Sequence, residues 1–220
     1  EGVAIDKLFP IATTGIVSAN DELNFSFTEE EQRAKISDLL TLPENEWRGK
    51  YHRPKDSRDW TFAGAKNDAM KGGGWYRQIS YRPFDNRSTY YTGRSRGLYT
   101  NPRNGVMQSL MHDNICLVAC RITAVDEWRH GVAAGSPADN CLVSGVTKER
   151  GYVFPLYLYK ENFGKLERVP NLDPGILAKL AAAVGFAPSP EEVFDYIYAV
   201  LHTPQYRERY REFLKVDFPR

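Results

Sequence analysis

The sequence has few cysteines and no long hydrophobic run. Three cysteines among 220 residues do not make a disulfide framework, and an odd number fits a reducing cytoplasm. No apolar run approaches the ~18 residues of a transmembrane helix, and the first residues do not resemble a signal peptide. We therefore expect a cytoplasmic domain with no membrane partner. Because the chain opens at Glu1 and not at Met, we expect a piece of a longer protein.

Motifs for catalysis and for cofactor binding are missing too. No Gly-x-x-x-x-Gly-Lys-Ser/Thr loop occurs, so Gly72–Gly74 is interpreted as a flexible turn. Asn101-Pro-Arg-Asn differs from the motif with which amino-methyltransferases grip a flipped base, and the histidines have no partners at motif spacing. We predict no catalytic residue and no cofactor in this chain. A stand-alone nuclease or RNA-modifying enzyme is the least favoured hypothesis.

One spacing resembles that of a metal site. His112, Cys116 and Cys120 are four residues apart, but both cysteines lie in an apolar, strand-like run. Four residues of strand span ~13 Å, whereas two zinc thiolates must converge on one ion. We predict no metal site.

Charge is distributed unevenly along the chain, although the net charge is only +1. Residues 47–103 hold 13 Lys and Arg against 4 Asp and Glu, while the rest of the chain holds 16 basic and 24 acidic residues. A basic segment in an acidic frame is typical of a protein that binds a polyanion.

Arginines alternate with aromatic residues inside this basic segment. Alternating patterns at 75–82 and 88–92 predict a β-hairpin, with its turn at Asp85-Asn86. Guanidinium groups bind phosphates and guanine edges, and aromatic rings stack on exposed bases. The alternative is an ordinary surface hairpin whose aromatic residues form core and whose arginines pair with the acidic frame.

Helices are predicted mainly near the two ends of the chain. Thr28 and Glu31 form a capping box before a helix over 29–41. Ser189-Pro190 begins another helix, which Pro204 ends. We also expect helices over 172–184, after Pro102 and after Pro204, and mostly loops elsewhere in 44–105.

Strands are expected over 115–120 and 152–159, with short strand pieces over 5–17. Pro155 favours an edge or a bulge for the second of these strands. The fold class is therefore α+β: a mixed, mostly antiparallel sheet with flanking helices and a C-terminal helical segment. We divide the chain into an α/β region over 1–170 and a helical segment over 171–220, which can form one cooperative unit.

Three stretches resemble a single family. They begin at Tyr81 (YRPFDNRSTYYTGRSRG), Tyr152 (YVFPLYLY) and Pro190 (PEEVFDYIYAVLHTPQYRERYREFLKVDFPR). With them the chain resembles the C-terminal specificity region of type ISP restriction-modification enzymes and related adenine-specific DNA methyltransferases. Residues 14–21 are similar to the beginning of such regions. Segments 44–74 and 121–150 carry no such resemblance.

The resemblance implies a DNA sequence-recognition module of a bacterial cytoplasmic enzyme. In such enzymes a nuclease, a helicase-type ATPase and an N6-adenine methyltransferase precede this region. The resemblance implies that the parent enzyme uses S-adenosylmethionine, ATP and magnesium. It also implies that double-stranded DNA and the upstream domains are the partners of this chain.

The resemblance also divides the basic residues between two roles. The arginine motif over 82–96 is expected to hold the phosphate backbone or to brace a distorted duplex, because family members select different sequences. Base reading then belongs to the unmatched segments, with Lys55, Arg58 and Lys66 among the cationic candidates. The residues that we expect to contact DNA are Lys50, Arg53, Lys71, Arg77, Arg82, Arg87, Tyr90, Tyr91, Arg94 and Arg96.

A protein-interaction module is the alternative function. In that hypothesis the C-terminal helices, with Tyr206, Tyr210 and Phe213, dock onto the upstream methyltransferase or helicase. Arginines on a concave face would favour DNA, whereas arginines paired with carboxylates would favour a docking or structural role.

Overall fold

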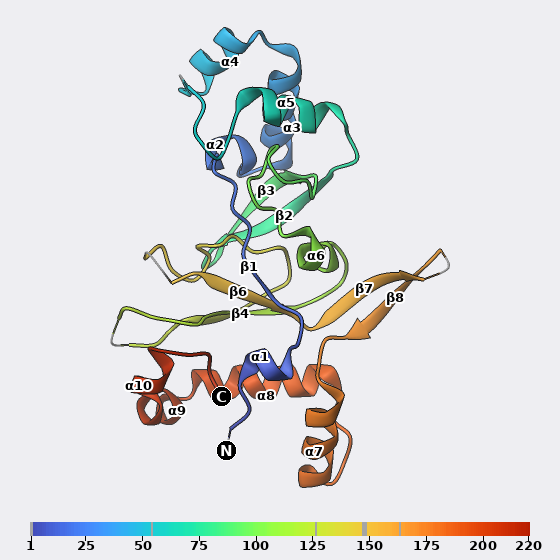
Figure 1. The fold of residues 1–220 in the computed structure, drawn as a ribbon, viewed down its shortest axis with the longest axis vertical. Helices are drawn as coiled ribbons and strands as arrows, with labels where there is room; N and C mark the ends of the chain where they lie inside the picture. Colours follow the sequence, from blue (N-terminus) through green and yellow to red (C-terminus); the bar gives the residue numbers. More distant parts are fainter. Residues whose placement is uncertain (1, 54, 126, 147–148, 163) are drawn as a thin grey trace.

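A central antiparallel sheet separates two groups of helices in the computed structural model (Figure 1). The structure describes residues 2–53, 55–125, 127–146, 149–162 and 164–220. The chain order of helices and strands mixes the two types, and every pairing between named strands is antiparallel. The predicted α+β class is therefore confirmed.

The central sheet has the order β1-β6-β4-β5. Its strands are β1 (Thr13–Thr14), β6 (Gly151–Pro155), β4 (Cys116–Cys120) and β5 (Gly131–Ala134). The predicted strand over 152–159 is in fact two strands, because Leu156 separates β6 from β7 (Tyr157–Asn162). The edge position that Pro155 favoured is wrong, because β6 lies between β1 and β4. Pro155 is the last residue of β6, beyond the two residues that pair with β1.

Both faces of this sheet are covered, which explains why all five residues of β4 are buried. Cys116 and Val118 belong to a hydrophobic cluster shared with the helices and hairpin above the sheet in Figure 1. Leu117 and Ala119 point the other way, into a second cluster shared with the terminal segments below it. Side chains alternate between the faces of a strand, so one apolar run serves two cores.

Helices α2 (Asp21–Asn24), α3 (Glu29–Thr41), α4 (Glu44–Lys50) and α5 (Phe62–Met70) lie above the sheet. The prediction of α3 is confirmed, and the hydroxyl of Thr28 accepts a hydrogen bond from the Glu31 N–H at 3.2 Å. The prediction of loops over most of 44–105 is wrong at α4 and α5. Buried Trp47 and Phe62 lie on these helices, so tertiary packing of aromatic rings stabilises segments that lack a clear helical period.

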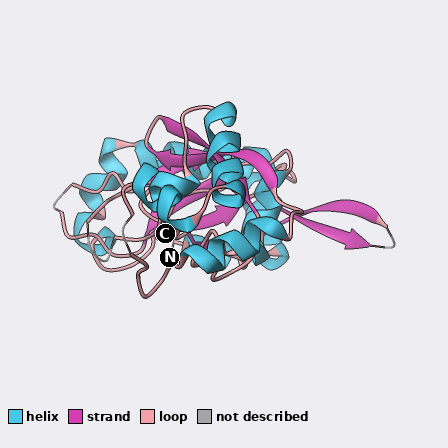
Figure 2. Ribbon diagram, turned by 90° about the horizontal axis from the view of Figure 1, so that it is seen from above, coloured by secondary structure: helices cyan, strands magenta, loops and turns pink. Residues whose placement is uncertain are grey.

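The predicted hairpin is present as β2 (Trp75–Arg82) and β3 (Asp85–Tyr91), but its turn is Pro83-Phe84 and not Asp85-Asn86. The pairing register shifts between Ser80 and Arg82, which marks a bulge next to the turn. A second hairpin, formed by β7 and β8 (Lys165–Pro170), extends away from the body of the molecule (Figure 2).

Helices α6 (Asn104–Met107) and η1 (Gln108–Met111) form the predicted short helix after Pro102. Below the sheet lie α1 (Ile5–Leu8), α7 (Pro174–Val184), α8 (Pro190–His202), α9 (Pro204–Arg209) and α10 (Arg211–Leu214). The helix α1 replaces the first of the expected strand pieces. The predicted start of α8 is confirmed by a capping box between Ser189 and Glu192.

The second cluster takes residues from both sides of the predicted boundary at 170/171. It contains Phe9 and Phe154 together with Leu201 and Leu214. The division into two regions stays a prediction. No helix in the described part of the chain is both long enough and apolar enough to span a bilayer.

Candidate nucleic-acid interface

Nearly half of the 13 cationic side chains in the basic segment form ion pairs with carboxylates of the described residues. Six of them lie within 4 Å of a carboxylate; these are Arg48, Lys50, Arg58, Arg82, Arg87 and Arg94. Their partners include all four acidic residues of the segment and three from outside it; the partners are Asp56, Asp59, Asp68, Asp85, Glu44, Asp38 and Asp139. The excess positive charge therefore resides on the other cations.

The arginines of the motif over 82–96 are mostly used inside the protein. Arg82 donates to the carboxylate of Asp139 at 2.6 Å, and Arg87 makes a two-pronged contact with Asp85. Burial raises the pKa of Asp139, although the charge and hydrogen bond of Arg82 act against this. These pairs favour a structural role for Arg82 and Arg87, as the ordinary-hairpin alternative predicts.

Asp68, a residue that the sequence did not single out, organises the following loop. Its buried carboxylate accepts hydrogen bonds from the Thr92 hydroxyl at 2.8 Å, the Leu98 N–H at 3.0 Å and the guanidinium of Arg94. Gly97 approaches this carboxylate so closely that a Cβ there would lie 2.4 Å from its atoms. Three converging donors and one obligatory glycine thus fold residues 92–98 around the end of α5.

The expectation that Tyr90 and Tyr91 contact bases does not agree with their burial. Tyr91 is fully buried, and its hydroxyl donates to the Pro102 carbonyl at 2.9 Å. The Tyr90 hydroxyl accepts a hydrogen bond from the Gly74 N–H at 3.1 Å. Burial also raises the pKa of Tyr91 above its ordinary range. In this structure both rings are core, and neither presents a face to a base.

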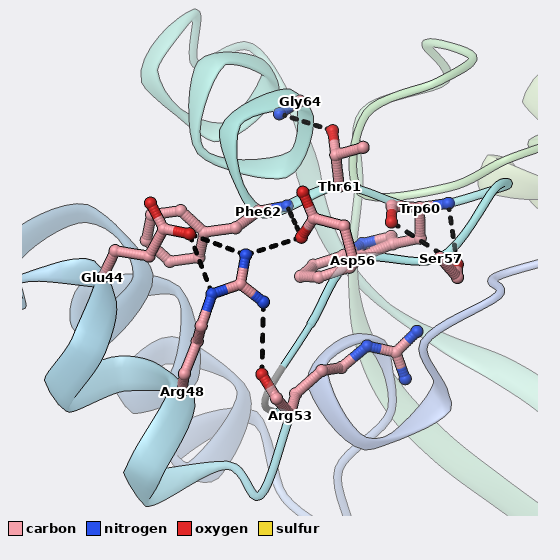
Figure 3. A network of polar contacts seen from close by, with 9 residues as sticks. All are labelled: Glu44, Arg48, Arg53, Asp56, Ser57, Trp60, Thr61, Phe62 and Gly64. Atoms are coloured by element: carbon pink, nitrogen blue, oxygen red, sulfur yellow. Dashed lines mark hydrogen bonds and ion pairs between the residues drawn. The ribbon is translucent and has the colours of Figure 1, made fainter.

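The loop between α4 and α5 is held in shape by Arg48 (Figure 3). Its guanidinium donates to Glu44 at 2.6 and 2.8 Å, to Asp56 at 2.6 Å and to the Arg53 carbonyl at 3.2 Å. The same oxygen of Asp56 accepts the Phe62 N–H at the start of α5. The hydrogen bond from Arg48 is the main reason that the pKa of Asp56 is lowered. The described parts of the loop are thus tied to α4 and to the start of α5.

Aromatic rings form the base of this loop. Trp47 stacks on Trp60 at 5.8 Å and lies 5.2 Å from Phe62, and all three are buried. Arg53 lies over the Trp60 ring at 4.9 Å and donates to the Ala19 carbonyl at 3.0 Å. Arg53 is therefore a bracing residue as well as a cation. The pairing of Trp47 with Trp60 had no signal in the sequence, since the two rings are 13 positions apart in an irregular segment.

Three loops with exposed cations are held side by side. The Thr100 hydroxyl donates to the Asp59 carbonyl at 2.6 Å, and Arg94 donates to the Gly72 carbonyl at 2.9 Å. We call residues 55–61, 71–74 and 93–101 the basic loop cluster. Its exposed cations are Lys55, Arg58, Lys71 and Arg96, and only Arg58 among these pairs with a carboxylate in the described chain, that of its sequence neighbour Asp59. An ion pair between exposed sequence neighbours contributes little free energy, so Arg58 is available to a ligand.

The remaining candidates have mixed environments. Arg77 is exposed on β2 and donates only to the carbonyl of Tyr76 among described groups. Lys50 pairs with Asp38, and Lys66 is half-buried beside Phe62. The structure thus brings Lys55, Arg58, Lys71 and Arg96 together, and it assigns the motif arginines Arg82, Arg87 and Arg94 to internal contacts.

The second unmatched segment, 121–150, is also held by one buried carboxylate. Glu149 accepts from the Ser144 hydroxyl at 2.5 Å and from the Ala124 N–H, and it contacts the His130 ring at 3.1 Å. Burial raises its pKa, but these hydrogen bonds outweigh that effect and leave the pKa below its ordinary value. In Figure 1 this segment and the α4–α5 loop both lie on the left side of the molecule, opposite the β7–β8 hairpin.

Cysteine and metal chemistry find no support among the described residues. Cys116 and Cys120 are buried in β4, and burial raises the pKa of each thiol to about 12. No group of three or more His, Cys, Asp or Glu side chains in the described ranges is arranged to hold a metal ion. These thiols are core residues.

The structure is an α+β scaffold with a cluster of basic loops on its surface. The model of the Type ISP C-terminal specificity domain matches residues 7–220, nearly the whole chain. The chain therefore belongs to this family, and its predicted identity as the specificity module of a restriction-modification enzyme is confirmed. A comparison with curated proteins found no match.

Solved structures share the fold. A cryo-EM structure of a DrdV–DNA complex superimposes with a TM-score of 0.71 at 24% identity, covering 97% of this chain and 21% of that chain. The ATP-dependent Type ISP enzyme LlaBIII bound to DNA gives 0.70 at 20% identity, covering 100% and 15%. A nuclease-deletion mutant of the Type ISP enzyme LlaGI with a DNA substrate mimic gives 0.60 at 19%, covering 97% and 20%. This chain thus spans about a fifth or less of their lengths.

Proposed function

We propose that this domain selects a DNA sequence by placing the basic loop cluster against duplex DNA. The observation that supports this most directly is a contrast between two sets of cations. Lys55, Arg58, Lys71 and Arg96 of the cluster are exposed, whereas Arg82, Arg87 and Arg94 are paired with carboxylates. A cation held on a rigid loop loses little conformational entropy on binding, which favours specific contacts. The DNA complexes of its structural relatives agree with this role.

The residues of the cluster divide into two roles in this proposal. Arg58 lies in the unmatched segment and presents a planar fork, the group that pairs with guanine in the major groove. Lys71 and Arg96 flank the structural loop around Asp68 and are suited to phosphates, which carry no sequence information. Arg82, Arg87 and Arg94 support the loops from within.

Binding to a randomised duplex library, followed by a salt series on the selected duplex, tests the proposal. With about 6 phosphate contacts, affinity falls ~10³-fold between 50 and 200 mM salt. Arg96→Ala and Lys71→Ala should each weaken binding to all DNA sequences alike and reduce the slope of log affinity against log salt concentration by about 1. Arg58→Ala should reduce the preference at one base pair by ~5- to 150-fold. Arg209→Ala, an exposed arginine of α9, is the matched control. Affinity that does not change with salt would contradict the proposal.

The wider assignments concern the parent enzyme. We propose that an N6-adenine methyltransferase and a helicase-type ATPase precede this domain, that they use S-adenosylmethionine, ATP and magnesium, and that the enzyme works in the bacterial cytoplasm. The family name supports this order, since it places the domain at the C-terminal end.

A second function, docking to the preceding domain, is favoured by an apolar groove below the sheet. The groove has a volume of about 540 Å³, and its walls include Val3, Ile176, Leu180 and Ile197. No residue of α7 is fully buried, although the helix carries an apolar stripe. In a C-terminal domain the preceding domain is joined to the N-terminal residues. Here the N-terminal residues Gly2 and Val3 line the groove. We therefore propose the adjoining upstream domain as its occupant.

Hydrogen exchange on the parent enzyme and on this chain alone tests the docking. Amides of α7 should exchange more slowly in the parent enzyme, and Leu180→Asp should abolish that difference. Ala178→Asp, at an exposed position of α7 that does not line the groove, is the control for added charge. Equal exchange of α7 in both proteins would overturn the docking proposal while leaving DNA binding unaffected.

A further inference from the structure

The turn of the β2–β3 hairpin holds a phenylalanine in an unfavourable and fully exposed position. Phe84 has a φ of +61° and an exposed fraction of 109%. Pro83 precedes it, and proline suits the first central position of both common turn types. A positive φ at the second central position is that of a type II turn, where glycine or asparagine is normally found. A bulky side chain there is strained.

The side chain of Phe84 gains no packing that would offset this strain. The ring of Phe84 takes part in no aromatic or cation–π contact of the described chain, and its exposure leaves it no core to fill. A strained residue without packing is the pattern expected where local structure is maintained for function.

The strands behind this turn are held firmly. Arg82 pairs with Asp139 at 2.6 Å, and the Tyr81 hydroxyl donates to Asp21 at 2.8 Å. The Ser80 N–H donates to the Pro137 carbonyl at 2.9 Å, and the Ser80 carbonyl accepts the Asp139 N–H at 3.0 Å. These contacts connect the hairpin end to the first residue of α2 and to the segment that follows β5. The ring is therefore presented on a rigid support.

We propose that Phe84 is a wedge that inserts between adjacent base pairs of the bound DNA. Apolar side chains on DNA-binding proteins enter base steps, unstack them and kink the duplex. Such insertion is easiest at the flexible TA and CA/TG steps. The arginines beside the turn, Arg82 and Arg87, retain positive charge near the phosphates even though each is paired. The proposal rests on the proposed DNA-binding function.

Fluorescence of 2-aminopurine measures the unstacking directly. The probe is a 30-bp duplex selected by this chain from the randomised library, with 2-aminopurine replacing one adenine at a time. The unaltered chain should raise the fluorescence at one step. Phe84→Gly and Phe84→Ala should abolish that rise and weaken affinity ~5- to 150-fold, whereas Phe84→Leu should retain part of both. Phe186→Ala, which removes another exposed phenylalanine, is the control.

Folding of the variants separates a wedge from a structural residue. Phe84→Gly removes the strain of a positive φ, so its urea midpoint should stay at or above that of the unaltered chain. A lowered midpoint would show a structural role and overturn the proposal, as would an undiminished fluorescence rise with Phe84→Gly. Tight binding with no rise at any adenine would also overturn the wedge, but not the DNA-binding function. Absence of binding by the unaltered chain would overturn both.

Discussion

The arginines of the β2–β3 hairpin and those of the α4–α5 loop have the same chemistry but different environments. Arg82 pairs with the buried carboxylate of Asp139, which is 57 residues away in the sequence. Arg58 pairs only with its sequence neighbour Asp59, and its side chain is 90% exposed. Arg82, Arg87 and Arg94 of the motif thus stabilise the domain, whereas Arg58 and the motif's own Arg96 are exposed. The surroundings of each arginine, and not its chemistry, therefore decide whether it braces the scaffold or is exposed to a ligand.

The largest expected effect is on the scaffold side of this comparison. Asp68→Ala removes the buried acceptor of three donors and should lower the free energy of unfolding by about 3–4 kcal/mol, because those donors lose their partner without water to replace it. Urea unfolding measures this change. Asn67→Ala, on the exposed neighbour, should have little effect. Similar stability of the two variants would contradict the role given to Asp68.

A smaller loss is expected for Arg82→Ala, about 2 kcal/mol at pH 7, since the side chain of Arg82 is 35% exposed. The variant leaves Asp139 buried without its cation, so the already raised pKa of Asp139 rises further. A raised folded-state pKa means that the folded state binds the proton more tightly, and the deficit should shrink as the pH falls toward 4.

The combined variant Arg82→Ala/Asp139→Asn provides the control. It removes both charges and should recover most of the lost stability at pH 7, with no recovery on acidification. A deficit in Arg82→Ala that is the same at pH 7 and pH 4.5 would show that the charge of Asp139 is not its cause.

Acid should destabilise the segment 121–150 more than it destabilises the hairpin. The pKa of Glu149 is lowered in the folded state, so its contribution is complete above the unfolded pKa of about 4.5 and is lost as the pH falls through the folded value. Glu149→Gln should lower the free energy of unfolding by about 1 kcal/mol at pH 7. The variant should then lose less stability than the unaltered chain when the pH falls from 5 to 3. Urea unfolding midpoints of both proteins across this pH range measure the difference. Identical pH dependence of the two proteins would show that Glu149 is not the source of the loss of stability in acid.

The smallest effect concerns Arg58 itself. Asp59→Ala removes the neighbouring carboxylate, so DNA affinity at 50 mM salt should rise about two- to threefold, and less at 200 mM because salt screens the added field. The urea midpoint should not change, because both groups are exposed. Weaker binding by this variant would mean that Asp59 positions Arg58 and does not merely compete for it.

Local rules predicted those elements whose signals are local. The cap at Thr28, the capping box at Ser189 and the apolar run of β4 correctly indicated α3, α8 and a buried strand. Helices α4 and α5 escaped prediction because burial of Trp47 and Phe62 against distant residues stabilises them. The turn was misplaced because Asp85-Asn86 has ordinary turn chemistry, whereas Pro83-Phe84 includes a residue that turns normally avoid.

The candidate site was predicted in outline and not in detail. The basic segment is real, and Lys55, Arg58, Lys71 and Arg96 remain exposed within it. The assignments to Tyr90 and Tyr91 failed because alternating aromatic residues look alike in sequence whether they face solvent or core. Asp68 gave no signal, since a lone acid on an irregular segment has no period or motif.

The sequence by itself determined the family, the α+β class and the segregation of charge, because these follow from residue types and their order along the chain. Only the tertiary structure decided which cations are free. An ion pair forms where two side chains meet in space, and the partners of Arg82 and Arg94 come from positions 57 and 26 residues away. The same physical reason governs Phe84, whose exposure is set by the segments that hold its turn.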